Sequence, residues 1–300
     1  MAAITAPALP MTRGRRAALA IGVPVCLLLI AYNGLDLVAN FGEGRYPVSY
    51  TVPAGAKSLT LNVAGQLTIK PTTASRAVLT GTARYSLVRP ALAEHTSGGT
   101  IALGYGCEFP VGDCELDATV TVPATVTTLT AHSGSGNATV TGIKGPVTLS
   151  TGDGNLSVGQ TSGPLTLSTD SGSIQVSAAR SDTLSASTGD GSIQATGVTS
   201  PTITVNTDSG SINGSGIATA TITASTGDGD ITIAFTSVPR DVQVDTDSGN
   251  ITLVLPRGNT RYHVRANTDS GTVNTLPDDP SSTNLITASS GDGNITISQQ

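Results

Sequence analysis

The chain has few of the large side chains that fill an ordinary globular core. Its 300 residues include three phenylalanines, six tyrosines and no tryptophan, although 38% of the residues are hydrophobic. Aromatic side chains dominate the packing of thick cores, whereas a narrow layer between strands is filled by small and branched aliphatic residues. The composition therefore favours a thin, extended core.

Charge is also scarce, and it is unevenly placed. Charged residues make up 12% of the chain. From residue 126 onward there are six lysines and arginines, fourteen aspartates and no glutamate, which gives this part a net charge of −8. An acidic surface repels phosphate backbones and anionic lipid headgroups. We therefore expect no nucleic-acid partner.

One long apolar run is present, close to the N-terminus. Arg13, Arg15 and Arg16 precede an uncharged run over residues 17–32. With the next six residues through the interface, the run approaches the length that spans a bilayer. Basic residues in front of such a helix favour a cytoplasmic N-terminus. Cleavage of the run as a signal peptide, which would give a secreted protein, is the alternative.

The run divides the chain into segments. We predict a short cytoplasmic basic segment at 1–16, a transmembrane signal anchor at 17–38 and a linker at 39–45. The remaining residues would then lie outside the cytoplasm.

Cysteine and histidine offer little for metal binding. Cys26 falls in the apolar run, and Cys107 and Cys114 are the two cysteines of the exported part. An even pair in an exported segment, six turn-forming residues apart, predicts a disulfide. The three histidines are scattered along the sequence, so we expect no metal site and no cofactor.

A glycine with a fixed apolar surround returns nine times in the last two-thirds of the chain. Seven and five residues before it, and two and four residues after it, 34 of 36 positions are apolar, the exceptions being Gly214 and Thr275. Self-similarity at this period indicates stacked units with one continuous core. The period runs from 18 to 22 residues, and the repeat-turn glycines are Gly136, Gly154, Gly172, Gly191, Gly210, Gly229, Gly249, Gly271 and Gly293.

The spacing within each unit is that of β-strands. Inward residues lie two apart with Ser, Thr, Asn or Gln between them, and the intervals between such runs hold Gly, Asp, Ser and Pro. We predict an all-β chain whose residues 126–300 form a β-solenoid of about nine coils. Residues 46–125 have a weaker rhythm and are predicted to form an irregular N-terminal β cap. A sandwich of two sheets is the structural alternative.

The glycine turn has two alternating forms, Gly-Asp-Gly and Asp-Ser-Gly, and coils two to seven alternate them strictly. The aspartates could form a calcium ladder, because carboxylates and turn carbonyls are hard oxygen ligands. We prefer a structural role in which Asp and Ser bond backbone amides and glycine supplies a positive φ. Alternation also separates like charges, whereas a calcium ladder would keep its ligands in register. The aspartates concerned are Asp153, Asp170, Asp190, Asp208, Asp228, Asp247, Asp269 and Asp292.

Nothing in the sequence indicates catalysis. A carbohydrate-cleaving β-helix needs a carboxylate pair or a metal in a groove built on long loops. These turns are short and uniform, and Phe235 and Tyr262 are the only aromatics from residue 126 onward. We expect no enzyme. Three arginines of one irregular turn, Arg257, Arg261 and Arg265, could instead meet an acidic partner or balance nearby aspartates.

The repeated Thr-x-x-Gly-(Ser/Asn/Asp)-Ile coil resembles the bacterial "putative adhesin" family of β-strand-repeat domains, a domain of unknown function. The motif is carried, for example, by residues 151–156 and 169–174. The resemblance covers roughly residues 46–300 and implies a place in the bacterial cell envelope. It implies no defined activity and no functional residues.

Taken together, the sequence predicts a non-enzymatic, membrane-anchored, extracytoplasmic rod that acts as an adhesin-like display or interaction module. The ligand would be an envelope or surface component. An envelope-stress sensor or regulator working through a membrane partner is the alternative, and a carbohydrate-active enzyme ranks third. We also expect the last coil, 294–300, to form an uncovered end of the rod and to allow end-to-end self-association.

Overall fold

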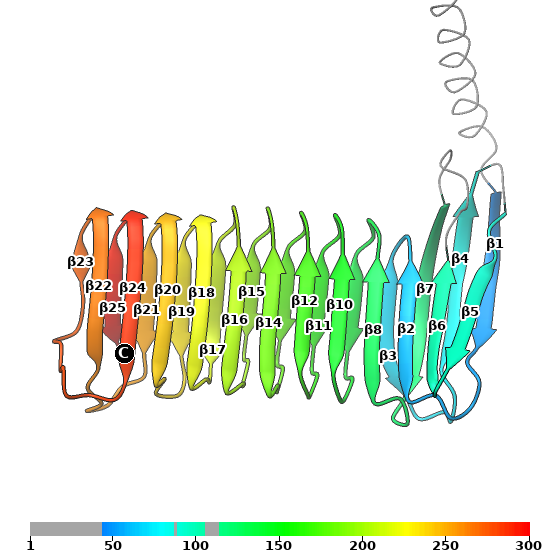
Figure 1. Cartoon of the computed structure of the whole chain (residues 1–300), viewed down its shortest axis with the longest axis horizontal. Helices are drawn as coiled ribbons and strands as arrows, with labels where there is room; N and C mark the ends of the chain where they lie inside the picture. The colour runs from blue at the N-terminus through cyan, green and yellow to red at the C-terminus, as the bar shows by residue number, and fades with distance from the viewer. Residues whose placement is uncertain (1–43, 87–88, 106–113) are drawn as a thin grey trace, which may run out of the picture.

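The computed structural model describes residues 44–86, 89–105 and 114–300, and these residues form a long rod made of two facing sheets (Figure 1). In order across it, the 13-stranded sheet contains β1 (Gly44–Thr51), β4 (Val78–Tyr85), β7 (Cys114–Pro123), β3 (Leu67–Thr72), β9 (Ala138–Thr141), β11 (Leu156–Gly159), β13 (Ile174–Ser177), β15 (Ile193–Thr196), β17 (Ile212–Ile217), β19 (Ile231–Phe235), β21 (Ile251–Leu255), β25 (Ile295–Gln299) and β23 (Val273–Asn274). The 12-stranded sheet contains β22 (His263–Ser270), β24 (Leu285–Asp292), β20 (Asp241–Ser248), β18 (Thr221–Asp228), β16 (Thr202–Thr207), β14 (Thr183–Thr188), β12 (Leu165–Thr169), β10 (Val147–Thr151), β8 (Thr128–Ser133), β2 (Ser58–Val63), β6 (Thr100–Tyr105) and β5 (Leu92–Ser97).

Each repeat of the sequence forms one coil of the rod. Its first strand joins one sheet, the glycine turn reverses the chain, and its second strand joins the other sheet. Equivalent strands pair in parallel and in register, so that Leu149 lies opposite Leu167 and Leu167 opposite Ala186. The predicted all-β solenoid of stacked coils is confirmed for the described residues.

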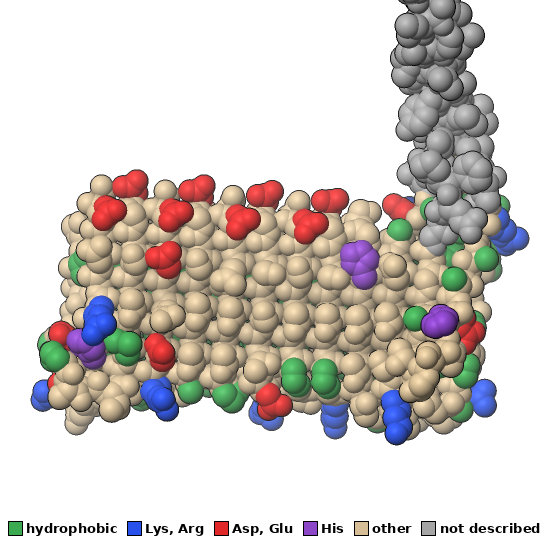
Figure 2. Space-filling view, in the orientation of Figure 1, with side chains coloured by type: hydrophobic (Ala, Val, Ile, Leu, Met, Phe, Trp, Pro, Cys, Tyr) green, Lys and Arg blue, Asp and Glu red, His purple; other side chains and the backbone are tan. Residues whose placement is uncertain are grey.

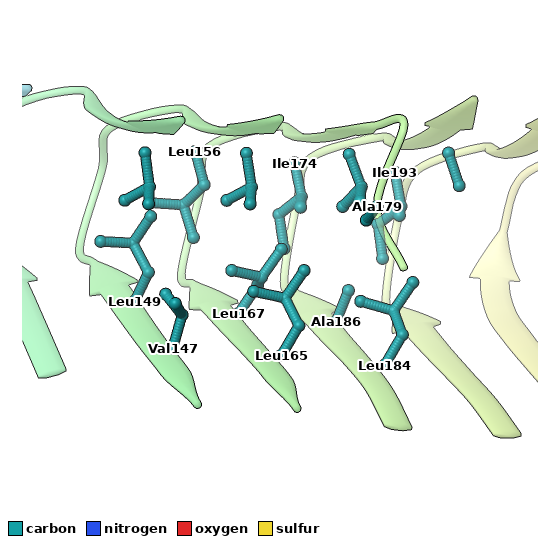
Figure 3. Packing of buried hydrophobic residues seen from close by; sticks show 14 of the residues in the cluster. Val147, Leu149, Leu156, Leu165, Leu167, Ile174, Ala179, Leu184, Ala186 and Ile193 are labelled. Carbon is teal, nitrogen blue, oxygen red and sulfur yellow. The ribbon is translucent and has the colours of Figure 1, made fainter. Parts of the chain in front are cut away.

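The core is a thin layer between the two sheets. Because successive side chains of a strand point to opposite faces, the four apolar columns all turn inward. In three consecutive coils Leu149, Leu167 and Ala186 stack along the rod and meet the column that begins with Leu156 and Ile174 (Figure 3). Every coil contributes only a few aliphatic side chains, which accounts for the scarcity of aromatic residues.

A fifth inward column lies at the corner that links one coil to the next, seven residues after the glycine. This column was not predicted from the sequence, because one of its members is a threonine and because it lies three residues, not two, after the preceding apolar column. Its members are buried, and they are Ile143, Thr161, Ala179, Val198 and Ile217. Single bridges join neighbouring corners in parallel from Lys144 to Ala218.

The two polar exceptions in the apolar columns have structural causes. The register shifts between Gly214 and Ile217, and the Ile217 side chain fills the space where a side chain at Gly214 would point. Thr275 belongs to the outermost coil at its end of the rod, where it is only partly buried. Neither position needs an aliphatic side chain.

At the C-terminal side, the coils do not stack in the order of the chain. Strand β24 lies between β20 and β22, and β25 lies between β21 and β23. The last coil is therefore inserted, and the preceding one, formed by β22 and β23, closes the rod. The expectation that residues 294–300 form the uncovered end is wrong, because β25 pairs with β21 along its whole length and with β23 at Ile295 and Thr296 on the other side.

Chain order is also broken near the N-terminus. Strands β2 and β3 pair in parallel with β8 and β9, and β6 and β7 form a further coil outside them. The antiparallel strands β1, β4 and β5 complete this end.

Four of the six tyrosines gather at this N-terminal end of the rod. The hydroxyls of Tyr46 and Tyr105 lie 3.1 Å apart, and the Tyr46 ring meets that of Tyr85 edge to face. Arg89 lies 3.9 Å above the Tyr46 ring. Large side chains are thus used where the repeat stops and an irregular gap has to be filled.

Candidate interaction surfaces

The repeat-turn glycines form a column in which backbones of adjacent coils touch. A Cβ atom on Gly191 would lie 1.9 Å from the carbonyl oxygen of Gly172, and each of the other eight would meet a similar oxygen at 1.8–2.3 Å. The predicted positive φ is wrong for eight of the nine, since Gly271 is the only one with it. Glycine is needed at these positions because a Cβ atom would overlap the backbone of the adjacent coil. Positive φ occurs instead at the opposite corner of the coils, including at Gln160 and Ala178.

Two hydrogen-bonded ladders hold this turn edge together. The Thr or Ser three residues before each glycine donates to the glycine carbonyl of the neighbouring coil, as Thr188 does to Gly172 at 2.7 Å, and all of these residues except Thr268 are buried. The residue after each glycine, except Thr272 in the outermost coil, uses its side-chain oxygen to accept an amide of the next coil, as Asn137 does from Asn155 at 2.8 Å. The hydroxyls are therefore structural, and their burial removes them from consideration as nucleophiles.

The eight turn aspartates line the same edge on its outside (Figure 2). Their two forms place them in two parallel rows. In the two coils of the Gly-Asp-Gly form, Asp228 and Asp292 are in register with Ser248 of the coil between them. That coil has the Asp-Ser-Gly form, so its aspartate, Asp247, lies one residue earlier. Members of one row are thus two coils, or about 10 Å, apart.

The alternation of the two turn forms is complete in space, although it is broken in sequence. The consecutive coils that contain Asp247 and Asp269 have the same form. The inserted coil, which carries Asp292, separates them and restores the alternation to the end of the rod. This break in the sequence was the signal from which the insertion could have been inferred.

The turn aspartates do not cap the turns. All eight are exposed, and within the described residues none of their carboxylates has a hydrogen bond or an ion pair. The prediction that they bond backbone amides is therefore wrong, because backbone contacts and the two ladders already satisfy these turns. In the same part of the chain no group of three or more His, Cys, Asp or Glu residues could hold a metal ion.

The two broad faces of the rod carry few charges, among them Asp245 and Arg265, and are rich in hydroxyl groups. On one face His132 lies 2.9 Å from the Ser150 hydroxyl. Nucleophilic catalysis by such a pair requires a third group to orient the histidine and donors for an oxyanion. Within the described residues no carboxylate is hydrogen-bonded to His132, and the pair stands on an open sheet.

Cations gather at the corner opposite the acidic edge (Figure 2). Lys144 and Arg180 bridge to either side of Ser162, so they are two coils apart. An open groove of about 450 Å³ runs between them, lined by Lys144, Gln160, Thr161, Ser162, Ala178, Arg180, Gly197 and Thr199. Asp182 and Asp241 lie along the same corner, so this corner carries both signs of charge, whereas the turn edge carries aspartates.

The predicted arginine turn lies at the C-terminal end of the rod. Arg261 forms an ion pair with Asp279 at 3.6 Å, and the Arg265 guanidinium donates to His263 at 3.1 Å. Asp278 accepts the amide of Val264 at 2.8 Å and contacts the His263 ring at 2.9 Å. These contacts, the amide first, lower the pKa of Asp278.

Several predicted features fall on residues outside the described ranges. They are the basic segment, the apolar run 17–38 with Cys26, and Cys107; Cys114 begins β7 and packs against the core. The disulfide and the anchor stay predictions. In the part of the chain that the structure describes, no helix has the length and apolar character to cross a membrane.

The chain belongs to the Toastrack DUF4097 family, whose profile matches residues 117–300. This confirms the resemblance drawn from the repeat. A search of curated proteins finds no match.

Two solved structures with a TM-score above 0.5 share the fold at low sequence identity, and a third match has a lower TM-score. A "putative adhesin" from Parabacteroides merdae is 11% identical, with 87% of this chain and 98% of that chain covered and a TM-score of 0.51. A "putative lipid binding protein" from Parabacteroides distasonis is 14% identical, with 85% and 96% covered and a TM-score of 0.51. A "putative adhesin" from Bacteroides fragilis is 14% identical, with 86% and 97% covered and a TM-score of 0.43.

Proposed function

We propose that the protein is a non-enzymatic, membrane-anchored rod of the bacterial cell envelope that presents its surfaces to envelope or surface ligands, in the manner of an adhesin. The observation that carries the proposal is the uniform solenoid itself. The hydroxyls and glycines of its turns are engaged in holding coils together, which leaves broad faces, two charged edges and two ends as the means of contact.

The direction of the rod supports an anchored arrangement. Strand β1, which follows the predicted anchor, lies at one end of the rod, and β22 and β23 lie at the other (Figure 1). An anchor at residues 17–38 would therefore leave the far end of the rod free to reach a partner. The family membership and the likeness to proteins named as adhesins agree with this role.

A topology experiment tests the proposal. Alkaline phosphatase fused after Gln300 is expected to be active, because the rod lies outside the cytoplasm, and the chain should stay in the membrane fraction with residues before Ala17 retained. The matched control replaces Arg13, Arg15 and Arg16 with glutamate, which should lower the active fraction. Activity of a cytoplasmic reporter would contradict the proposal, and a soluble product starting near Asn40 would replace the anchor with a cleaved signal.

A sensor that works through a membrane partner remains the second candidate. The full chain in detergent would serve as bait in envelope extracts. Recovery of wall polymer or surface material supports the display role, whereas recovery of one integral membrane protein favours the sensor.

A further inference from the structure

The C-terminal end of the rod has an uncovered edge. Strands β22 and β23 are the outermost strands of their sheets in the described residues. The core layer beneath them is open as well, since Val273 is 46% exposed and Val264 and Ala266 are only partly buried. Soluble proteins usually protect such an edge with proline, inward charge or a covering segment. The opposite end has such protection in β1, which carries Arg45 and Pro47.

Part of the β22 edge is closed by its own chain. The amide of His263 donates to the carbonyl of Asn284 on the β24 side, so the backbone groups of Val264, Ala266 and Thr268 point outward. The carboxylate of Asp278 accepts the outward amide of Val264, and the backbone of Asp278 forms a parallel β-bridge with Tyr262. The carbonyl of Ser270 accepts the amide of Gly293, so the free edge runs from Arg265 to Asp269.

This free edge is complementary to itself. Its solvent-facing side chains are Arg265, Asn267 and Asp269, a cation and an anion placed symmetrically about a neutral residue. If two such strands run antiparallel about a two-fold axis at Asn267, each Arg265 lies opposite Asp269 of the second copy. The same register places Ala266 opposite Thr268, whose outward amides and carbonyls then exchange hydrogen bonds.

We propose that the C-terminal end of the rod docks on the same end of a second copy, through antiparallel pairing of β22 centred on Asn267. Both sheets would then continue from one rod toward the other, and the open layer at Val264, Ala266 and Val273 would be covered. Head-to-tail stacking is disfavoured because the other end is completed by antiparallel strands. The inference deepens the proposed function, on which it rests for its setting, by naming a partner.

The end of a single coil is small beside the roughly 800 Å² per partner of a standard interface. We therefore expect pairing to be weak in dilute solution and stronger where anchored chains are concentrated. An isologous contact of this kind closes at two copies, so the product is a dimer of rods and not a filament.

Charge exchange tests the pairing with the full chain in detergent, followed by sedimentation over a range of concentrations. Arg265→Asp and Asp269→Arg should each weaken self-association by about tenfold or more, because two attractive cross-strand pairs become two repulsive ones. A mixture of the two variants should associate, since every cross-strand pair is again opposite in charge, and the doubly exchanged chain should associate with itself. Unchanged melting of all variants shows that they are folded.

A cysteine at Asn267, on the proposed two-fold axis, tests the pairing independently of charge. Residues that face each other across a non-hydrogen-bonded antiparallel pair have Cα atoms about 4.5 Å apart, which a disulfide can join. Asn267→Cys should therefore form a linked dimer on mild oxidation. Gln243→Cys, on β20 of the same sheet and equally exposed, is the matched control and should not.

Other outcomes overturn the inference. It fails if the chain is monomeric at every concentration, if single charge variants associate like the wild type, or if the edge binds a different protein while the chain itself stays single. These results leave the topology experiment unaffected, so failure of the dimer and failure of the envelope role can be told apart.

Discussion

At the residue scale, the repeated glycine is explained by space. The carbonyl oxygen of each turn glycine lies so close to the glycine of the adjacent coil that a Cβ atom there would overlap it. The same close approach lets the buried Thr or Ser donate to the neighbouring glycine carbonyl. One small residue therefore makes both the turn and the ladder feasible, which is why these two residue types recur together in every coil.

Replacing Gly191 with alanine should accordingly destabilise the rod by about 2 kcal/mol, in the range seen for overpacked interiors. The new methyl group would meet the backbone of Gly172, which cannot move without disturbing the neighbouring coil. Urea unfolding followed by circular dichroism measures the change. Gly104→Ala is the matched control, because a Cβ there has no atom within 4 Å, and it should be nearly neutral. Equal effects of the two variants would contradict the spatial explanation.

The sequence was informative about side chains that face the core and less so about those at the turn. Alternation determines which residues turn inward, so the four apolar columns could be predicted, and they are buried in every coil except the outermost one of β22 and β23. The role of the turn aspartates could not, because the partners of a surface carboxylate depend on contacts between coils. The fifth column was missed because Thr161 interrupts its apolar character.

At the scale of the elements, the insertion of the last coil is the main departure from the order of the chain. Stacking in chain order would place Asp269 directly beside Asp247, about 5 Å away. In water the repulsion at that distance is about 1 kcal/mol, so it contributes to the choice of order without deciding it alone. The repeat motif predicts that coils stack, but identical coils do not specify which neighbour each one takes.

Paired cysteines can report the order of the coils. Gln243 of β20 is in register with Thr287 of β24, and both side chains face outward. Adjacent strands lie about 4.8 Å apart, within the span of a disulfide. Gln243→Cys with Thr287→Cys should therefore cross-link within one chain. Gln243→Cys with Arg265→Cys, which would be neighbours if the coils followed chain order, should not, and the opposite result would show that the last coil is terminal.

At the scale of the whole molecule, one edge of the rod is acidic and the opposite edge carries charges of both signs. The turn aspartates follow one edge from β10 to β22, and Lys144 and Arg180 lie on the other. An acidic edge of this kind can orient the rod relative to charged surroundings without a specific site. Exposed charges are screened over about 8 Å at physiological salt, so this influence acts at short range.

The acidic edge also bears on calcium, which we predict to have no structural role. Calcium takes six to eight oxygen ligands at about 2.3–2.6 Å, so carboxylates of one row, about 10 Å apart, cannot share an ion. Diagonal neighbours such as Asp153 and Asp170 bring two carboxylates together at most. Thermal unfolding of the full chain in detergent should thus agree within about two degrees with calcium or with chelator, and magnesium at equal ionic strength is the control. Ligands that bind the folded state raise its melting temperature. A rise of many degrees with calcium alone would show that the two rows act together as a binding ladder.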